Sequence, residues 1–342
     1  MKWVRVSPAE GSPGAEGSGR MSRETGVKYM SKPKILVVGS MNMDLFVRDC
    51  NALPAYGQSI ISGEYGYATG GKGSNQAFAA ARLGGDVTMV GRIGKDTNGD
   101  QLLRSLTGAG VDVRYVVRDE AAQTGLALML VNSDGRYVCY VSIGANYRLS
   151  ADDVRRALDA ERFDMLVMQL EIPLETVYAT VALARERNIP VFLDAGPAMK
   201  IPMEGLRGLY ILSPNEAEAE ALTGISVETE EGALAAAKWL YGQAAPRYVI
   251  LKLGARGALL YDGAQAKFIP GFKVDAVDST AAGDTFGAAL AIGLCRGKPI
   301  EEAIVTAHAA AGICVSRQGA QVSVPTAAEV EQFLRERTGG AE

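Results

Sequence analysis

Histidine is nearly absent from this sequence. The 342 residues include one histidine, His308, which lies in the apolar run AHAAAG. Histidine-rich metal sites are therefore excluded. A Ser-His-Asp hydrolase would have to use this one imidazole, so we interpret His308 as a helix residue at the edge of a pocket or of the core.

Cysteine is also scarce, and no two cysteines form a C-x-x-C pair. They are scattered along the chain at Cys50, Cys139, Cys295 and Cys314. This spacing argues against a zinc site and against the disulfide framework of a small secreted protein. We expect reduced thiols and a cytoplasmic location.

Neither an excess of basic charge nor a long apolar run is present. The formal net charge is −4, which gives no electrostatic footprint for nucleic acid or for an acidic membrane surface. No apolar run approaches the roughly 18 to 20 residues that span a bilayer. We therefore expect a soluble protein whose ligands are small molecules, with neither nucleic acid nor membrane as a partner.

Two common nucleotide-binding motifs are missing too. The glycine-rich stretch ATGGKGSNQA at residues 68–77 has neither the spacing G-x-x-x-x-G-K-[ST] nor the spacing G-x-G-x-x-G. The dinucleotide fingerprint is likewise absent after the first predicted strand. A dinucleotide-dependent reductase is therefore disfavoured.

The sequence does contain an alternation of short apolar strands with segments of helical period. Apolar strands separated by helices predict βαβ units and a parallel sheet covered on both faces. We expect a doubly wound, mostly parallel α/β domain over residues 33–342. The predicted strands lie in KILVVG, FDMLVMQLE, PVFLDAGP, LYILSPNEAE and RYVILKLGARGALLY, and the predicted helices lie at 76–83, 101–109, 151–160, 174–187, 232–241, 284–295, 301–314 and 327–337.

Two segments, at about 45–67 and 125–142, break this alternation because extended stretches and turn residues replace the helices there. Asn-Ser-Asp-Gly at 132–135 is a strong hairpin signal. We expect a small β-sheet that covers a reactive phosphate as a lid and whose exposed face forms a homodimer. The alternative is that both segments are edge strands of the main sheet.

Residues 1–32 are rich in Ser, Gly, Glu and Lys and lack the apolar middle of a secretory signal. We expect either a disordered extension or a start site upstream of a natural beginning at Met30. The fold prediction therefore starts after this segment.

The run DSTAAGDTF at 278–286 is the strongest candidate for a catalytic centre. Small residues lead into a helix there, so the backbone N–H groups of Ala281, Ala282 and Gly283 are expected to form a phosphate pocket. Asp284 would stand beside the phosphoryl group and accept a proton from an attacking alcohol. The pattern predicts a kinase centre, and the alternative is an ordinary capped helix.

The glycines of ATGGKGSNQA allow the backbone to approach a ligand closely. Lys72 and Asn75 in this stretch suit the recognition of hydroxyl groups, and Asn75 is expected to open a helix. The alternative is a tight turn.

GSMNMD at 39–44 follows the first predicted strand. Open α/β sheets bind ligands beyond the carboxyl ends of their strands, so Asn42 and Asp44 are placed to grip a polyol. The alternative is an Asx turn that leaves the strand.

Acids and amides also stand at the exits of later strands. They are Glu171 in MQLE, Asp194 in LDAGP, and Asn215, Glu216 and Glu218 in SPNEAE. Such side chains can hold a hydrated magnesium ion, for which Asn215 and Glu218 are the candidates. The alternative is that Asn215 caps a helix whose first turn is acidic.

KLGARGA at 252–258 gives a glycine-lined shelf where an adenine ring or a phosphate could lie. A β-turn between two strands of a hairpin explains Gly254 and Gly257 equally well. Both interpretations stay open.

These motifs, in this order, resemble the ribokinase branch of the PfkB carbohydrate kinases. The resemblance covers residues 34 to about 325 and rests on GSMNMD, GGKGSN, QLE, SPNEAE, LGARG, DSTAAGDTF and SRQGAQVSVP. It implies a ribokinase-like fold and an ATP-dependent kinase that converts D-ribose to D-ribose 5-phosphate. The alternatives are 2-deoxyribose, fructose, ketodeoxygluconate or a nucleoside as substrate, or a catalytically silent sugar-sensing protein.

The resemblance also implies a role for each matching residue. Asp284 is the base, and Ala281, Ala282 and Gly283 are the anion hole. The sugar-binding positions are Asn42, Asp44, Gly71, Lys72, Asn75, Glu171 and Asp284. The positions around ATP are Asn215, Lys252, Gly254, Gly257, Gly283 and His308. Glu218 organises Mg²⁺ through water, and K⁺ is held, mostly by backbone carbonyls, at Asp278, Thr280, Cys314, Arg317, Gly319 and Ser323.

Five positions depart from the family pattern. Gln58 and Ser59 stand where Glu-Thr is usual, and Lys252 replaces a more common Thr near the nucleotide. Tyr147 and Arg148 are also unexpected after Gly-Ala-Asn. We expect these departures to affect the pocket or the phosphate contacts and to leave the chemistry unchanged.

Overall fold

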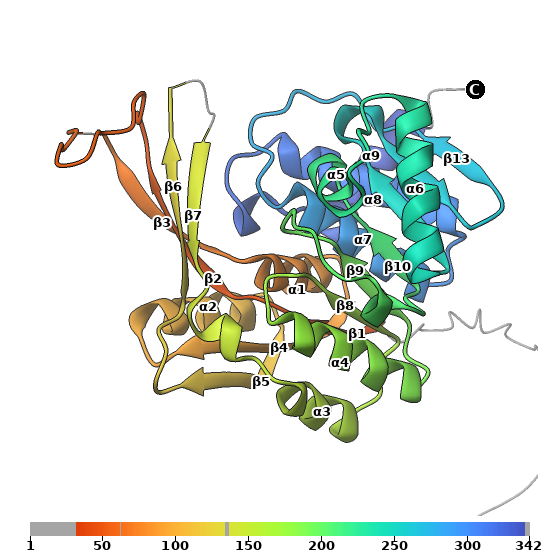
Figure 1. The fold of residues 1–342 in the computed structure, drawn as a ribbon, viewed down its shortest axis with the longest axis horizontal. Helices are drawn as coiled ribbons and strands as arrows, with labels where there is room; N and C mark the ends of the chain where they lie inside the picture. Colours follow the sequence, from red (N-terminus) through yellow and green to blue (C-terminus); the bar gives the residue numbers. More distant parts are fainter. Residues whose placement is uncertain (1–31, 62, 134–136, 339–342) are drawn as a thin grey trace, which may run out of the picture. The chain divides into compact units, whose positions relative to one another are not determined.

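The computed structural model describes residues 32–61, 63–133 and 137–338 (Figure 1). The predicted extension at 1–32 therefore lies outside the described residues, apart from Lys32. The same holds for the second half of the predicted hairpin turn at 132–135.

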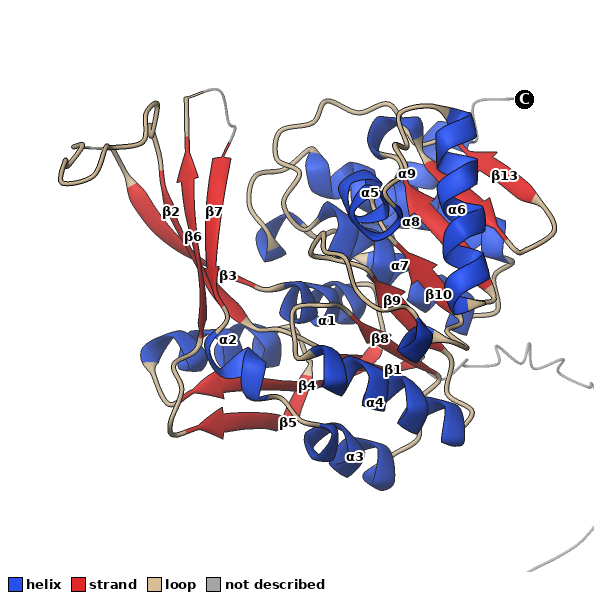
Figure 2. Ribbon diagram, viewed as in Figure 1, coloured by secondary structure: helices blue, strands red, loops and turns tan. Residues whose placement is uncertain are grey.

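A nine-stranded sheet forms the centre of the described chain (Figure 2). Its order is β13-β12-β11-β10-β9-β8-β1-β4-β5, and neighbouring strands from β11 to β5 run parallel. Strand β12 is antiparallel to both β11 and β13, so one edge is antiparallel. The strands are β1 (Lys34–Val38), β4 (Asp86–Gly94), β5 (Asp112–Asp119), β8 (Met165–Met168), β9 (Val191–Asp194), β10 (Ile211–Ser213), β11 (Tyr248–Lys252), β12 (Ala258–Tyr261) and β13 (Ala266–Ile269).

Helices cover both faces of this sheet. In β1, Leu36 and Val38 belong to one apolar cluster and Ile35 and Val37 to another, because successive strand residues point to opposite faces. The first cluster contains α3 (Ala151–Ala160), α4 (Leu174–Glu186), α5 (Glu216–Thr223) and α6 (Glu230–Ala244). The second contains α1 (Lys72–Arg82), α2 (Thr97–Gly108), α7 (Ala282–Cys295), α8 (Ile300–Val315) and α9 (Ala327–Thr338). Among the described residues, no helix combines the length and the apolarity that a membrane crossing requires.

A second, four-stranded sheet stands beside the main domain, and we call it the lid sheet (Figure 1). Its order is β3-β2-β6-β7; β2 is parallel to β6, and the other neighbours are antiparallel. The prediction of a small separate sheet is confirmed, and the alternative of edge strands in the main sheet is wrong. Its strands are β2 (Asn42–Val47), β3 (Tyr65–Gly70), β6 (Gly125–Val131) and β7 (Tyr137–Ser142).

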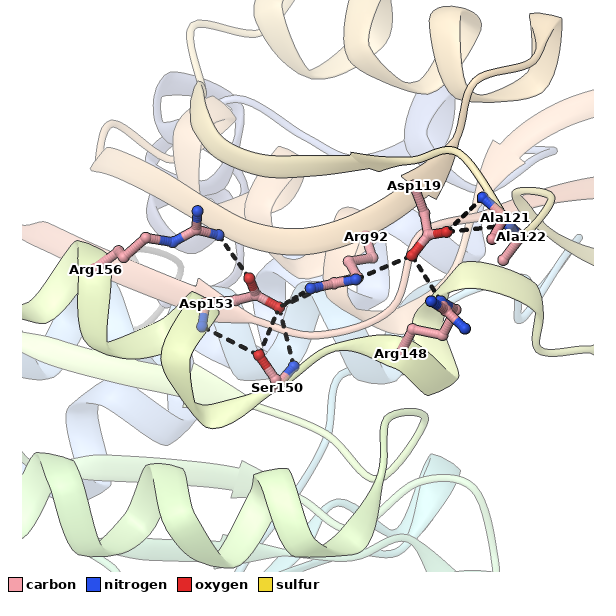
Figure 3. Close-up of polar contacts among 8 residues, drawn as sticks. All are labelled: Arg92, Asp119, Ala121, Ala122, Arg148, Ser150, Asp153 and Arg156. Carbon is pink, nitrogen blue, oxygen red and sulfur yellow. Dashed lines mark hydrogen bonds and ion pairs between the residues drawn. The ribbon is translucent and has the colours of Figure 1, made fainter.

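Ion pairs join the main sheet to the chain segments that lead into and out of the β6–β7 hairpin (Figure 3). Arg92 of β4 donates to Asp119 Oδ2 and to Asp153 Oδ2, each at 2.9 Å. Asp119 Oδ2 also accepts from Arg148 Nε at 2.7 Å. This bond to Arg148 is the main reason that the pKa of Asp119 is lowered to about 2. Asp119 therefore stays charged, and the network links the main sheet to the chain on either side of the β6–β7 hairpin.

Candidate active site

Asp284 lies in the first turn of α7 and is 5% exposed. Its Oδ2 accepts a hydrogen bond from Asn75 Nδ2 at 3.1 Å, and its Oδ1 accepts one from Gln76 Nε2 at 3.3 Å. Burial raises the pKa of Asp284 to about 6, because water no longer solvates the charged form. A carboxyl with this pKa is ionised at neutral pH and still basic enough to accept a proton.

The N-terminus of α7 has no side-chain cap. Ala281 occupies the N-cap position in the left-handed conformation, with φ 60°. The N–H of Ala282 makes only a long bond to Ser279 O, at 3.3 Å. The alternative of an ordinary capped helix does not describe this helix end, whose first-turn donors suit an anion.

Asn42 and Asp44 lie on β2 of the lid sheet, so the alternative of an Asx turn at this point is wrong. Both are buried and share one face of the strand, because they are two residues apart. Burial, followed by the charges of Glu171 and Asp284, raises the pKa of Asp44 to about 7. The lid strand therefore brings Asp44 within electrostatic range of the acids on the main domain.

Gly71 occupies the junction between β3 and α1, with φ 86°. A Cβ at this position would lie 2.6 Å from the backbone nitrogen of Asn42, so the three segments can meet this closely only at a glycine. Helix α1 begins at Lys72, three residues before the helix start predicted at Asn75. Asn75 consequently lies inside the first turn, where its side chain reaches Asp284.

Lys72 lies between two acids. Its backbone N–H donates to Glu171 Oε2 at 3.2 Å, and its Nζ lies 3.9 Å from Glu218 Oε1. Burial lowers the pKa of Lys72, but nearby carboxylates, Asp284 foremost, raise it above the ordinary value overall. Lys72 therefore carries a charge throughout the physiological range.

Two glutamines in the site were not predicted from the sequence. Gln76 Nε2 donates to Asp194 Oδ2 at 2.9 Å as well as to Asp284, so one amide bridges two buried acids. Gln169 Nε2 donates to Gln76 Oε1 at 2.6 Å and so fixes the orientation of that amide. The sequence offers one signal for these glutamines, which is their position beside predicted residues. Gln76 follows Asn75, and Gln169 lies in MQLE.

Asn146 was not predicted either. It lies in the 3₁₀ helix η1 (Gly144–Arg148) and is fully buried. Its Nδ2 donates to Asn42 Oδ1 at 2.7 Å, while its Oδ1 accepts from Met41 N at 2.8 Å. Asn146 therefore orients the amide of Asn42. Tyr147, by contrast, is 65% exposed.

Asn215 and Glu218 form a capping box at the start of α5. Glu218 N donates to Asn215 Oδ1 at 2.9 Å, and Asn215 N donates to Glu218 Oε2 at 2.7 Å. The capping alternative is thus present in the structure. Burial raises the pKa of Glu218, which nevertheless keeps Lys72 and Lys252 as its cationic neighbours, each at 3.9 Å.

The KLGARGA stretch connects β11 to β12 through η3 (Gly254–Arg256). Leu253 N donates to Gly257 O at 2.8 Å, and both Gly254 and Gly257 have positive φ, at 53° and 100°. The turn of a hairpin, which was the alternative, is therefore observed. Lys252 sends its side chain to Asp194, with Nζ 2.6 Å from Oδ1.

His308 lies on α8, 8% exposed, with its ring 5.2 Å from that of Phe286. Burial lowers its pKa to about 4, so the imidazole is neutral. Its Nε2 is buried and has no hydrogen-bond partner within the described part of the chain. The sequence interpretation, a helix residue at the edge of the core, agrees with this placement.

The residues matched to a K⁺ site form a loop cluster beside α7. Asp278 Oδ1 accepts from Thr280 N and its Oδ2 from Gly319 N, both at 2.9 Å. Cys314 Sγ lies 3.1 Å from Ser323 Oγ. Burial raises the pKa of Asp278, but the bonds from Thr280 and Gly319 outweigh it and lower the pKa overall.

Arg317 belongs to this cluster through its backbone alone. Its N–H donates to Cys314 O at 3.1 Å, while its guanidinium pairs with Glu329 at 2.6 Å. The side chain therefore does not add positive charge next to Asp278.

The model of the pfkB family carbohydrate kinases matches residues 32–327 of this sequence. The chain belongs to this family. A ribokinase of Haemophilus influenzae is 36% identical to this kinase over 304 residues, which make up 88% of this chain and 98% of that protein. A deoxyribokinase of Salmonella typhi is 33% identical over 302 residues, or 88% of this chain and 98% of that protein.

A solved structure extends the similarity of this pfkB kinase to three dimensions. The structure of Arabidopsis thaliana ribokinase complexed with ribose and ATP has a TM-score of 0.81 and 33% identity, covering 90% of this chain and 99% of that one. The predicted family and the predicted fold are confirmed. The chain is a phosphotransferase with an alcohol group as acceptor, while ribokinases and deoxyribokinases among its relatives leave the sugar undecided.

Proposed function

We propose that this pfkB kinase transfers the terminal phosphoryl group of ATP to the primary hydroxyl of a pentose, converting D-ribose to D-ribose 5-phosphate. One observation carries this proposal. Asp284 is a buried carboxyl with a pKa of about 6, at an uncapped helix N-terminus and hydrogen-bonded to Asn75. The similarity to the Arabidopsis ribokinase complexed with ribose and ATP supports the choice of both substrates.

Asp284 is the proton acceptor in the proposed step. The hydroxyl oxygen of the sugar bonds to the terminal phosphorus, the bond from phosphorus to the β–γ bridging oxygen breaks, and ADP leaves with that electron pair. The hydroxyl proton passes to Asp284. The N–H groups of Ala281, Ala282 and Gly283 neutralise the charge on the phosphoryl oxygens, which is the main task in phosphoryl transfer.

The sugar binds between the lid sheet and the first turn of α1. Amide and carboxylate groups in a buried site reject analogues that lack a hydroxyl, because the unpaired group then loses its hydrogen bond. Closing the lid sheet would exclude water from the phosphoryl group. The proposed contacts are Asn42, Asp44, Gly71, Lys72, Asn75 and Glu171.

ATP lies along the carboxyl ends of β10 and β11. The neutral ring of His308, with its unpartnered Nε2, suits the neighbourhood of an adenine base. Positive φ angles at Gly254 and Gly257 let the backbone follow a flat ligand. The remaining proposed contacts are Asn215, Lys252 and Gly283.

Mg²⁺ accompanies ATP, and Glu218 would hold it through water. Glu218 already accepts the capping bond from Asn215 and has an ammonium 3.9 Å from each of its oxygens. This arrangement fits a hydrated ion better than a directly bound one. When bound, the ion would neutralise charge on the β- and γ-phosphates.

A monovalent cation, K⁺, would be held by the loop cluster beside α7. Because its pKa is lowered, Asp278 is ionised and offers a carboxylate there. Burial raises the pKa of the Cys314 thiol, which stays neutral. The proposed groups are those of Asp278, Thr280, Cys314, Arg317, Gly319 and Ser323.

A homodimer would form through the outer face of the lid sheet. Tyr67, Leu45, Leu128 and Tyr140 lie side by side across all four strands. Tyr67 and Tyr140 are 57% and 68% exposed. A row of exposed apolar side chains on a sheet is typical of an interface, and a second copy would cover it.

Among other sugars, 2-deoxyribose is the second candidate, because the Salmonella deoxyribokinase is nearly as similar as the ribokinases. No observation favours fructose, ketodeoxygluconate or a nucleoside as the substrate. None favours a silent sugar-sensing role either. The scattered, reduced cysteines support a cytoplasmic location, which stays a prediction.

A substrate panel tests the proposed function. ADP release from ATP and Mg²⁺ would be measured with ribose, 2-deoxyribose, fructose, ketodeoxygluconate and adenosine, each with K⁺ and with Na⁺. We expect the highest kcat/KM with ribose and a higher rate in K⁺. A preference for another acceptor would replace ribose, and binding of ribose without ADP release would support the silent protein.

A further inference from the structure

Lys252 ends β11, and its side chain is 12% exposed. Its Nζ lies 2.6 Å from Asp194 Oδ1 and 3.9 Å from Glu218 Oε2. It also lies 3.6 Å from the point that a Cβ on Gly283 would occupy. The ammonium therefore stands directly beside the uncapped N-terminus of α7.

The helix N-terminus by itself disfavours a cation at this position. The N-terminus of a helix carries partial positive charge, so an ammonium beside it is repelled. Asp194, which is fully buried, holds Lys252 there with one short ion pair. An ammonium has three N–H donors, so further donors remain for a ligand. A phosphate bound at Gly283 would relieve the repulsion and meet both sets of donors.

We propose that Lys252 is a catalytic residue whose ammonium donates to a nonbridging oxygen of the terminal phosphoryl group during transfer. The proposal rests on the proposed function and deepens it, since it assigns the side chain a role at the reacting phosphorus. As the hydroxyl oxygen bonds to that phosphorus and ADP departs, Lys252 and the N–H groups of α7 share the charge on the phosphoryl oxygens.

Asp194 is a positioning residue in this proposal. Its Oδ1 holds Lys252, and its Oδ2 accepts from Gln76 Nε2 at 2.9 Å. The same Gln76 amide donates to Asp284 Oδ1 at 3.3 Å. The cation and the base are therefore tied together through one carboxylate and one amide, which fixes both relative to the transferred group.

The test compares Lys252→Met with Lys252→Arg and with a matched control, Lys267→Met. Lys267 lies on β13, is 57% exposed and pairs with Glu301. If Lys252→Met alone folds poorly, the double variant Lys252→Met/Asp194→Asn removes the charge of Asp194 together with that of its partner. The readouts are kcat with ATP and ribose, KM for ribose, and calorimetric Kd for ADP and for the imido analogue of ATP.

We expect Lys252→Met and the double variant to lower kcat about 100-fold, as the loss of one donor to a transition-state oxygen does. The Kd of the ATP analogue should rise about 10-fold, with the Kd of ADP and the KM for ribose within about twofold of the control. Lys252→Arg should recover part of kcat, because the guanidinium keeps the positive charge but its planar shape places the N–H donors differently.

Two results would overturn the proposal: a double variant whose kcat stays within about twofold of the control, or an equal loss of affinity for ADP and for the ATP analogue. The second result would place Lys252 at a phosphate that is not transferred. A wild-type chain that transfers no phosphate to any sugar would instead defeat the proposed function. The comparison of the Kd of the ATP analogue with the Kd of ADP would still show whether Lys252 contacts the terminal phosphate.

Discussion

The carboxyl groups of Asp44, Asp194, Glu218 and Asp284 are all buried in or beside the candidate site. Burial raises the pKa of Asp44, Glu218 and Asp284. For a carboxyl whose pKa rises on folding, the stabilising contribution is full below the ordinary pKa. It is lost as pH rises through the folded value. At neutral pH these acids therefore lower the stability of the unliganded protein, which is typical of functional sites.

The same pKa values predict the pH dependence of the reaction. Asp44, with a pKa of about 7, must be ionised to accept hydrogen bonds from the sugar, and Asp284, with a pKa of about 6, must be ionised to accept the proton. We therefore expect kcat/KM for the sugar to fall as pH decreases below about 7, with a slope greater than one near pH 5. Initial rates at saturating ATP between pH 5 and 8 measure this profile.

The variant Asp44→Asn separates the two groups. It should lower kcat/KM at every pH and leave a single falling limb near pH 6, which belongs to Asp284. Glu301→Gln, an exposed acid on α8 that pairs with Lys267, serves as the control and should keep the wild-type profile. A wild-type kcat/KM that stays constant between pH 5 and 8 would contradict the assignment of both acids.

Residues with a chemical signature could be predicted from the sequence, and residues that only orient them could not. Asp284 and Asn75 each stood out in a local motif, although they are 209 positions apart. Gln76, Gln169 and Asn146 act through amide bonds to residues 93 to 208 positions away. No local pattern contains such pairings, because they arise only when α1 meets α7 and the chain after β8, and when η1 meets β2.

At the scale of elements, the segment after β1 shows how a strand can be missed. In Asn42–Val47 the outer face is apolar, with Met43, Leu45 and Val47, while Asn42 and Asp44 face the site. This is a period of two, typical of a strand. The glycine and asparagine of GSMNMD left an Asx turn open as the alternative.

Most helices could be predicted from their periodicity. α3 matches its prediction at both ends, and α7 starts two residues earlier than expected. α5 was predicted only as an alternative, the helix that Asn215 would cap, since its eight residues EAEAEALT carry little apolar periodicity. Strands β4 and β5 were not predicted.

The 3₁₀ helix η1 carries a prediction about sugar binding. Asn146→Ala should raise the KM for ribose about 10-fold with little change in the KM for ATP, because Asn42 Oδ1 loses the donor that orients it. Steady-state kinetics with each substrate varied in turn measure the KM for ribose and the KM for ATP separately. Asn98→Ala, in the first turn of α2, is the control and should keep both values.

Melting temperatures of both variants show whether the fold is affected. A loss of stability alone would lower the amount of active enzyme and leave both KM values unchanged. Equal increases in the two KM values, or none, would contradict the positioning role of Asn146.

At the scale of the whole molecule, one face of the lid sheet carries Asn42 and Asp44, and the opposite face carries a row of apolar side chains. Its outer rows contain Tyr67 and Tyr140, and the bond from Arg148 in η1 to Asp119 at the end of β5 links the chain after β7 to the main sheet. A dimer through the outer face would place each lid sheet against its copy. Sugar binding and assembly would then involve the same four strands.

This arrangement predicts that charge on the outer face separates the subunits. Tyr67→Glu/Tyr140→Glu should convert a dimer to a monomer in sedimentation velocity runs, because two buried carboxylates at the interface lack partners. Tyr147→Glu, equally exposed at 65% but outside the lid sheet, should stay dimeric. A wild-type chain that sediments as a monomer at micromolar concentration would contradict the proposed interface.

The central claim is that Asp284 takes the proton of the sugar while the N-terminus of α7 holds the transferred phosphoryl group. The most direct measurement is turnover of ribose and ATP by Asp284→Asn, combined with calorimetry of both ligands. We expect kcat to fall about 1,000-fold or more, with ribose and the imido analogue of ATP still bound. Undiminished turnover in Asp284→Asn would contradict the claim.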